Sequence, residues 1–173
     1  MAGPTVTEMT LRIRQAADMV GSGFVADSEI LAFINGAYAE LFDICVASYE
    51  DYFTTTANVT LVANTASYST PTDMYKLLKA FWMDGTSRSL LRKFNLDEWD
   101  YYNEQYSGTD SNGCLRYRIF SDKIYFAPIP AAAGTVQLWY AAQPAKLTTG
   151  ASTLSINIPV GWEDYIVADG ASK

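Results

Sequence analysis

Apolar residues recur at helical spacing near the start of the chain. The pattern predicts a first helix over residues 5–19. Its apolar face is formed by Met9, Ile13, Ala16 and Val20. Thr5 and Glu8 have the spacing of a capping box, in which each side chain binds the other residue's backbone N–H. The glycines of "GSG" at 21–23 are predicted to end this helix in a turn.

A second, longer helix is predicted from Asp27, as its N-cap, to about Tyr49. One apolar stripe consists of Ile30, Ile34, Ala37, Leu41 and Cys45, and a neighbouring stripe of Leu31, Tyr38, Phe42 and Val46. An apolar face this wide indicates contact with more than one partner element.

The pattern changes to strand spacing from Tyr52 onward. Residues 52–70 are rich in Thr, Val and Tyr, which predicts two strands around a turn at 63–65. Residues 75–94 predict a further strand, a turn at Asp84-Gly85 and a returning strand. The middle of the chain is therefore expected to be a sheet.

The strongest hairpin pattern lies later in the chain. Two alternating segments, 115–120 and 124–127, are joined by the turn residues 121–123. One more strand is predicted over 134–144, where Val136, Leu138 and Tyr140 share a face.

A short helix is predicted between these strand regions, at residues 95–106. Asn95 and Glu98 fit its N-cap and third helical position. Its aromatic residues are Trp99, Tyr101, Tyr102 and Tyr106. They could form a stacking platform for bases or sugars. A helix packed on the sheet is favoured, because no Lys or Arg is interleaved with these rings.

The order of elements indicates an α+β fold, because the strands do not alternate regularly with helices. A last helix is predicted from near Pro159. Residues 1–50 and 158–173 are expected to form a small helical bundle. Residues 51–157 are expected to form an inserted antiparallel β domain that includes the short helix.

The charge balance limits the possible partners. Twelve Lys and Arg face nineteen Asp and Glu, a net charge of −7, and no basic cluster appears along the sequence. Tight binding to nucleic acid is therefore not expected. No apolar run suggests a membrane span and the N-terminus does not read as a signal peptide, which predicts a soluble protein of a cytoplasm-like compartment.

Enzymatic chemistry is the least favoured interpretation. The chain has no histidine, which removes Ser-His and Cys-His nucleophile pairs and histidine-ligated zinc. Glu163 and Asp164 are adjacent on a predicted helix, so they point about 100° apart and suit a helix start better than a catalytic pair. Cys45 and Cys114 are expected to be reduced thiols without a metal. No cofactor or metal site is expected.

The order of these features resembles the head-to-tail adaptor (connector) proteins of tailed bacteriophages, including the tail tubular protein A type. The resemblance is carried by four stretches, "SEILAFINGAYAELFD", "YFTTTANVTLVANTASYSTPTDMYKLLKA", "YRIFSDKIYFAPIP" and "LSINIPVGWEDYIVADGASK". It implies a virion structural protein that is not an enzyme and is assembled in the host cytoplasm.

The resemblance also implies partners. Such adaptors form a ring, usually of twelve subunits, between the portal protein and the tail tube or nozzle protein. DNA passes through the ring without specific binding, and no membrane is involved. The alternative from the sequence is a monomeric β-type module that binds a carbohydrate or peptide through Tyr101, Tyr102 and Tyr106.

Interface residues are expected on the second and last helices. Trp162 is expected to anchor the last helix to the first two helices, while residues 167–173 approach a neighbouring subunit or the portal. The candidate interface residues are Tyr38, Phe42, Trp162, Tyr165, Ile166, Val167 and Lys173.

Overall fold

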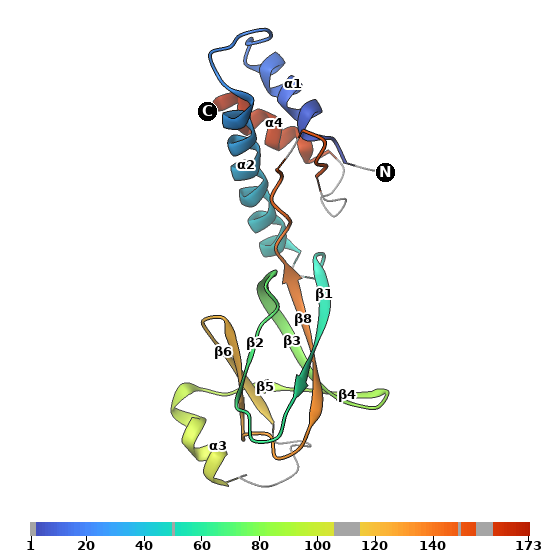
Figure 1. The fold of residues 1–173 in the computed structure, drawn as a ribbon, viewed down its shortest axis with the longest axis vertical. Helices are drawn as coiled ribbons and strands as arrows, with labels where there is room; N and C mark the ends of the chain where they lie inside the picture. Colours follow the sequence, from blue (N-terminus) through green and yellow to red (C-terminus); the bar gives the residue numbers. More distant parts are fainter. Residues whose placement is uncertain (1–2, 50, 106–114, 149, 155–160) are drawn as a thin grey trace. The chain divides into compact units, whose positions relative to one another are not determined.

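Figure 1 shows a computed structural model of the chain, which describes residues 3–49, 51–105, 115–148, 150–154 and 161–173. The fold is α+β, as predicted. The chain divides into two compact units. We call residues Met1–Phe53 with Pro144–Lys173 the helical unit, and Thr54–Gln143 the β unit.

The first helix of the helical unit, α1, spans Val6–Ala16 and confirms the predicted capping box. The Glu8 N–H donates to Thr5 Oγ1 at 3.2 Å, and the Thr5 N–H donates to Glu8 Oε2 at 2.7 Å. Because the first N–H groups of a helix have no partner inside the helix, these bonds fix where α1 begins.

The second helix, α2, spans Asp27–Ser48. Its N-cap is Ala26, whereas the sequence had suggested Asp27. The Ala26 N–H donates to Glu29 Oε2 at 2.8 Å, and Asp27 is the first helical residue, where its charge favours the helix start.

The wide apolar face of α2 contacts two helices, as predicted. α2 packs against α1 and against the last helix, α4 (Glu163–Ser172). Its buried side chains are Ile30, Ile34, Ala37, Tyr38, Leu41, Phe42, Cys45 and Val46. Contrary to the sequence-based expectation, α2 is long and apolar enough to cross a membrane, judged by length and composition alone and only within the described residues. Its buried face accounts for that composition, because it forms the core of the helical unit.

The last helix differs in detail from its prediction. Its predicted start at Pro159 lies outside the described residues, and α4 begins at Glu163 with Trp162 as its N-cap. Trp162 is 39% exposed, whereas Ile166 is completely buried. Ile166 is therefore the more deeply buried of the two residues, and the anchor role that the sequence assigned to Trp162 stays a prediction.

Close packing of α4 on α1 depends on a glycine. Gly170 is buried inside α4, and a Cβ at this position would lie 2.8 Å from Ile13 Cδ1. The helix therefore continues through Gly170, and the absence of a side chain there lets the two helices approach.

The segment that returns from the β unit is tied to the helices. The Val6 N–H donates to Ser152 O at 2.9 Å, and the Asn35 side chain bonds the Leu147 C=O and N–H at 3.0 and 2.9 Å. These bonds explain why the helical unit includes the chain from Pro144 onward, whereas the sequence had assigned residues up to 157 to the β part.

The β unit contains two four-stranded sheets. The first has the order β1-β8-β3-β4, and the second the order β2-β7-β6-β5. The strands are β1 (Thr54–Leu61), β2 (Ser67–Ser69), β3 (Met74–Asp84), β4 (Ser87–Leu90), β5 (Arg92–Lys93), β6 (Arg116–Phe120), β7 (Lys123–Ala127) and β8 (Gly134–Ala142). Every pairing is antiparallel except that of β5 with β6.

The predicted turns are present, but the pairing of strands is partly unexpected. The turn at Asp84-Gly85 and the hairpin of β6 and β7 are confirmed. By contrast, β1 and β2 flank the turn at 63–65 and belong to different sheets. One apolar core is formed by Leu61, Leu77, Ala80, Leu91, Leu115, Tyr117, Ile124, Phe126, Val136, Leu138 and Tyr140.

The short helix of the β unit follows β5. A 3₁₀ turn, η1 (Leu96–Glu98), leads into α3 (Trp99–Gln105). The Asn95 N–H donates to Glu98 Oε2 at 2.7 Å, which confirms the predicted start. The loop predicted at 107–113 and Tyr106 lie outside the described residues.

Candidate interaction surfaces

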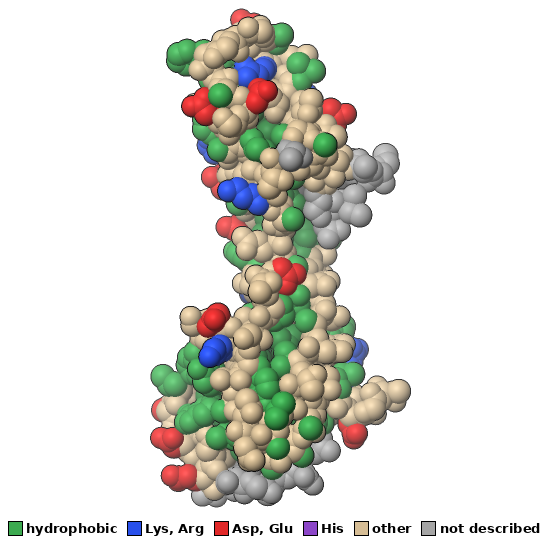
Figure 2. Space-filling model, viewed as in Figure 1, with side chains coloured by type: hydrophobic (Ala, Val, Ile, Leu, Met, Phe, Trp, Pro, Cys, Tyr) green, Lys and Arg blue, Asp and Glu red, His purple; other side chains and the backbone are tan. Residues whose placement is uncertain are grey.

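The net negative charge of the chain lies in the helical unit. The helical unit has eleven Asp and Glu against four Lys and Arg, whereas the β unit has eight of each. On the face drawn in Figure 2, Lys and Arg side chains are scattered and do not gather into one patch. The helical unit therefore presents an acidic surface that disfavours contact with phosphates.

The predicted interface residues separate into buried and exposed groups. Tyr38 and Phe42 are each 3% exposed and pack inside the helical unit, and Ile166 and Val167 are also buried. Trp162, Tyr165 and Lys173 remain accessible. Any contact with another molecule through the predicted set must therefore begin with these three.

Tyr165 and Lys173 of α4 are both joined to Glu40 of α2. The Tyr165 hydroxyl donates to Glu40 Oε2 at 3.4 Å. Burial and the Glu40 charge raise the pKa of Tyr165. Lys173 Nζ lies 2.6 Å from Asp169 Oδ2 and 3.8 Å from Glu40 Oε1. The bond to Asp169 raises the pKa of Lys173. Polar contacts therefore run along one side of α4, from Tyr165 in its first turn to Lys173 at its C-cap.

An exposed apolar loop, residues 17–26, joins α1 to α2. Phe24 is 89% exposed and Val20 is also exposed. Gly21 adopts a φ of 80°, a left-handed conformation that favours glycine. The sequence predicted this turn, but its placement of Val20 on the apolar face of the first helix is wrong, because α1 ends at Ala16 and Val20 is exposed in the loop.

Arg14 of α1 holds this loop in place. Its Nη1 donates to Ser22 O at 2.9 Å and its Nη2 donates to Val25 O at 2.7 Å. Nη2 also lies 2.8 Å from Asp27 Oδ1. One guanidinium therefore fixes both sides of Phe24, so its ring is presented on an ordered backbone.

The carboxylates at the start of α4 serve the fold. Asp164 forms an ion pair with Arg12 of α1, and Glu163 Oε2 accepts the Gly161 N–H at 2.8 Å. Both acids lie in the first turn of α4, as predicted. Among the described residues, no group of three or more Cys, Asp or Glu could hold a metal ion.

The two cysteines have no assigned chemistry. Cys45 is buried, and burial raises the pKa of its thiol. A raised pKa disfavours the reactive thiolate. Cys114 lies outside the described residues.

The outer face of the second sheet combines cations and rings. Arg118 is paired with Tyr125 and Phe120 with Lys123 across β6 and β7, so these side chains share a face. The Arg118 guanidinium lies 5.5 Å from the centre of the Phe120 ring. The sequence did not reveal this set, because strand pairing brings the residues together.

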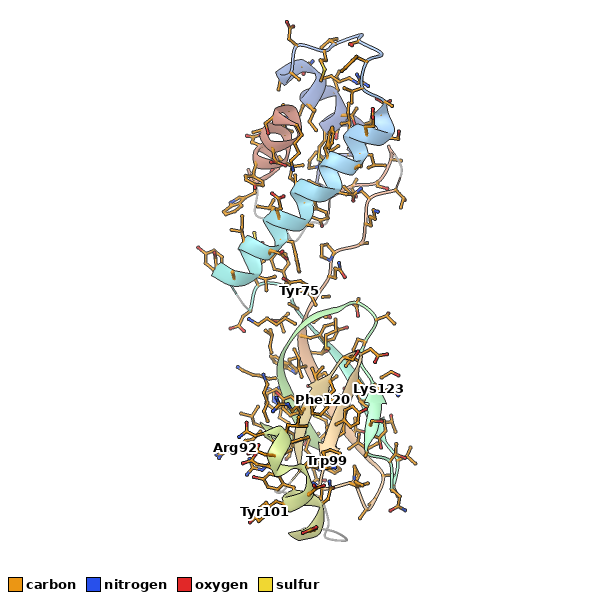
Figure 3. All side chains as sticks on the ribbon, turned by 90° about the vertical axis from the view of Figure 1, so that its left-hand side faces the viewer. Tyr75, Arg92, Trp99, Tyr101, Phe120 and Lys123 are labelled. Carbon is orange, nitrogen blue, oxygen red and sulfur yellow. The ribbon has the colours of Figure 1, made fainter. Side chains whose placement is uncertain are left out.

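The short helix α3 covers part of this face (Figure 3). The ring centres of Trp99 and Tyr125 lie 6.0 Å apart, and the Arg116 guanidinium lies 4.7 Å from the Tyr102 ring centre. Trp99 and Tyr102 therefore pack against the sheet, as the favoured interpretation predicted. Tyr101 remains exposed, and Tyr106 lies outside the described residues.

Two hollows in the β unit meet between β3 and β6. One, of about 430 Å³, is lined by residues that include Lys93, Asn95 and Arg118. The other, of about 520 Å³, is lined by residues that include Thr70 and Asp122. Leu77 of β3 and Ile119 of β6 line both hollows. We call the two hollows together the β groove; Tyr75 on its wall is labelled in Figure 3.

The comparisons with known proteins give one family. No curated protein was matched by the chain. A family model described as "SU10 adaptor protein" matches residues 4–170, which include all the elements described above except the last residues of α4. The chain therefore belongs to the SU10 adaptor protein family, a family of phage adaptor proteins.

Proposed function

We propose that this chain is the subunit of a head-to-tail adaptor ring of the tail tubular protein A type. Membership of a phage adaptor family implies contact with portal and tail components and a place at the head–tail junction of the virion. The proposal adds twelve subunits, a portal on one side, a tail tube or nozzle on the other, and assembly in the host cytoplasm. The match over residues 4–170 carries it.

The charge of the helical unit supports a ring through which DNA passes. This unit has seven more acidic than basic residues. An acidic wall repels phosphates, so DNA could move past it without being held. We therefore propose that acidic side chains of the helical unit line the channel.

The 17–26 loop is proposed to contact the neighbouring subunit. A large exposed ring on an ordered backbone is the kind of residue that anchors an interface. In a head-to-tail contact, Phe24 of one subunit does not meet Phe24 of the next subunit but a different surface of it. Contacts of this kind can close into rings. Trp162 and Tyr165 of α4 are proposed as part of the same subunit contact.

Assembly with the portal tests this function. The full chain is mixed with its portal protein and imaged by cryo-electron microscopy, and mass photometry measures the oligomer. We expect a closed ring of adaptor subunits on the portal. A chain that stays monomeric and leaves the portal bare would contradict the proposal.

The loop contact has its own variant. Phe24→Ser should strongly reduce assembly of the oligomeric ring. The unfolding temperature of the subunit should stay the same, because the Phe24 side chain makes little contact within the subunit. Val62→Ser removes an exposed apolar side chain from the β unit and serves as the matched control. Equal assembly of the two variants would exclude Phe24 from the subunit contact.

A further inference from the structure

We propose that the β groove binds an extended acidic segment of a partner protein, which adds as a strand to the edge of β6. Strand addition to an open edge is a common mode of peptide recognition, in which main-chain bonds supply affinity and side-chain pockets supply specificity. The inference concerns the β unit alone and does not depend on ring formation.

The first observation is an open strand edge. β5 has two residues and pairs only with Arg116 and Tyr117, whereas β6 continues to Phe120. Beyond Lys93 the chain turns away into η1, and the Phe94 N–H still reaches Tyr117 O at 3.2 Å. From Arg118 onward, this side of β6 therefore has no neighbouring strand among the described residues.

The second observation is the direction of the backbone groups of Ile119. Phe120 and Lys123 flank a two-residue turn and form a hydrogen-bonded pair, so Ile119 and Ile124 form a non-hydrogen-bonded pair. The Ile119 N–H and C=O therefore point away from β7, on the same side as the Tyr117 C=O. They are directed toward the open edge, where an added strand would find one donor and one acceptor.

The third observation is the space beside this edge. Ile119 lines both hollows of the β groove, together with Leu77 of β3. The open backbone groups thus lie beside two hollows that share the apolar side chains of Leu77 and Ile119. An extended segment would place one apolar side chain over Leu77 and Ile119, and the side chains on either side of it would point away from the groove floor.

The charges of the hollow of about 430 Å³ define the occupant, whereas Asp122 lines the other hollow. Lys93 is exposed, and Arg118 is held by the bond from its Nη1 to Phe94 O at 3.0 Å. Among the described residues, neither cation has an ion-pair partner within 4.0 Å. The acidic residues of the bound segment are therefore expected beside Lys93 and Arg118.

A second copy of this chain does not offer such a segment. Within the described ranges, Asp and Glu lie in helices or turns, apart from Asp84 at the very end of β3. The described residues of a second copy thus supply no extended acidic segment, which favours a segment of a different protein as the occupant. This reasoning selects a partner protein over a second subunit.

The test uses the full chain and a synthetic heptapeptide of alternating Glu and Val with blocked ends. Hydrogen exchange measured by mass spectrometry should show slower exchange in a fragment that covers Ile119, in whichever oligomeric state the chain adopts. The same peptide with Lys in place of Glu should give no protection. A peptide that is N-methylated on every residue should also fail, because it has no N–H left to pair with the strand edge.

Two variants locate the site. Ile119→Pro removes the open N–H and should abolish binding, whereas the fold tolerates it because proline is accepted at an edge. Lys93→Glu should weaken binding on the order of tenfold. Lys123→Glu changes a cation of β7, which lies on the side of β6 away from the open edge; it is the matched control and should bind normally.

The proposal is overturned by three results. These are equal binding of the Lys peptide, protection that excludes Ile119, or no protection at millimolar peptide. Protection of Ile119 that rises with protein concentration alone would identify a second copy as the occupant and would also overturn the assignment.

Discussion

The helical unit and the β unit divide two physical properties of the chain between them. The helical unit has the entire net charge of −7, and the β unit is neutral by the same count. The β unit has fifteen of the twenty-four aromatic residues, and some of these, such as Trp139 and Phe120, lie beside an arginine guanidinium. Net charge and most of the aromatic residues thus lie in different units, so that each property can be changed in one unit without the other.

The largest loss of stability is expected when a core side chain is removed from either unit, and this tests whether the two units are independent. Ile166→Ala in α4 and Leu138→Ala in β8 delete fully buried side chains. Each should cost about 2–5 kcal/mol of unfolding free energy. Hydrogen exchange should show faster opening only in the unit that contains the substitution. Faster exchange throughout both units would show that they unfold as one.

Trp162→Ala is the control within the helical unit. The sequence suggested a buried anchor, for which the cost would be about 3–5 kcal/mol. Because the ring is 39% exposed, we expect a smaller loss than for Ile166→Ala. Chemical denaturation of both variants compares them directly, and an equal loss would restore Trp162 as the anchor.

The helices were predictable because their information is local. The capping residues Thr5 and Glu8 lie three positions apart, and the stripes of α2 repeat within one or two turns. The sequence did not distinguish Trp162 from Ile166 as anchor. Both lie on one apolar stripe, and only the start of α4 places the indole at the solvent-exposed N-cap.

The sheets and the candidate surfaces were less predictable, because they depend on distant pairings. The pattern identified most of the strands, but not that β1 joins β8 while β2 joins β7. The β groove exists only because β5 ends after two residues beside β6. The exposure of Phe24 likewise depends on Arg14, ten residues earlier in the chain.

A smaller effect is expected from two glycines of the helical unit. Gly170→Ala places a methyl group against buried Ile13, and this overpacking should cost about 1–3 kcal/mol. Since replacing a helical glycine returns about 0.5–1 kcal/mol, the net effect should be a smaller loss. Gly36→Ala in α2 meets nothing within 4 Å and should stabilise by about 0.5–1 kcal/mol. Thermal unfolding should therefore shift in opposite directions. A loss in both variants would mean that α2 has a neighbour at Gly36.

Loss of the α1 cap should have a still smaller effect. Thr5→Ala removes the side-chain acceptor for the Glu8 N–H and should cost about 1 kcal/mol. The effect should be confined to the helical unit, so the exchange of β-unit amides should not change. An unchanged denaturation midpoint would show that water replaces the cap fully.

The same cap gives the helical unit an acid dependence. The Thr5 backbone N–H lowers the pKa of Glu8 from its ordinary value of 4.5. Its stabilising effect is therefore present above pH 4.5 and is lost as the pH falls through the lowered pKa. Glu8→Gln should make acid unfolding of this unit less steep, and an identical acid profile would contradict this origin.

Tyr117 is expected to make the stability of the β unit depend on alkaline pH. Its substitution should have the smallest effect on stability at neutral pH. Burial raises the pKa of Tyr117 above its ordinary value of 10.0. Above pH 10 the folded state keeps a proton that the unfolded chain releases. Stability is therefore present below pH 10 and falls as the pH rises through the raised pKa. Tyr117→Phe should unfold normally at pH 7 and lose less stability in alkali than the unchanged chain, measured by denaturation at both pH values. Glu8→Gln should therefore change only the acid response of the helical unit, and Tyr117→Phe only the alkaline response of the β unit. A change in the response of the other unit would contradict these assignments.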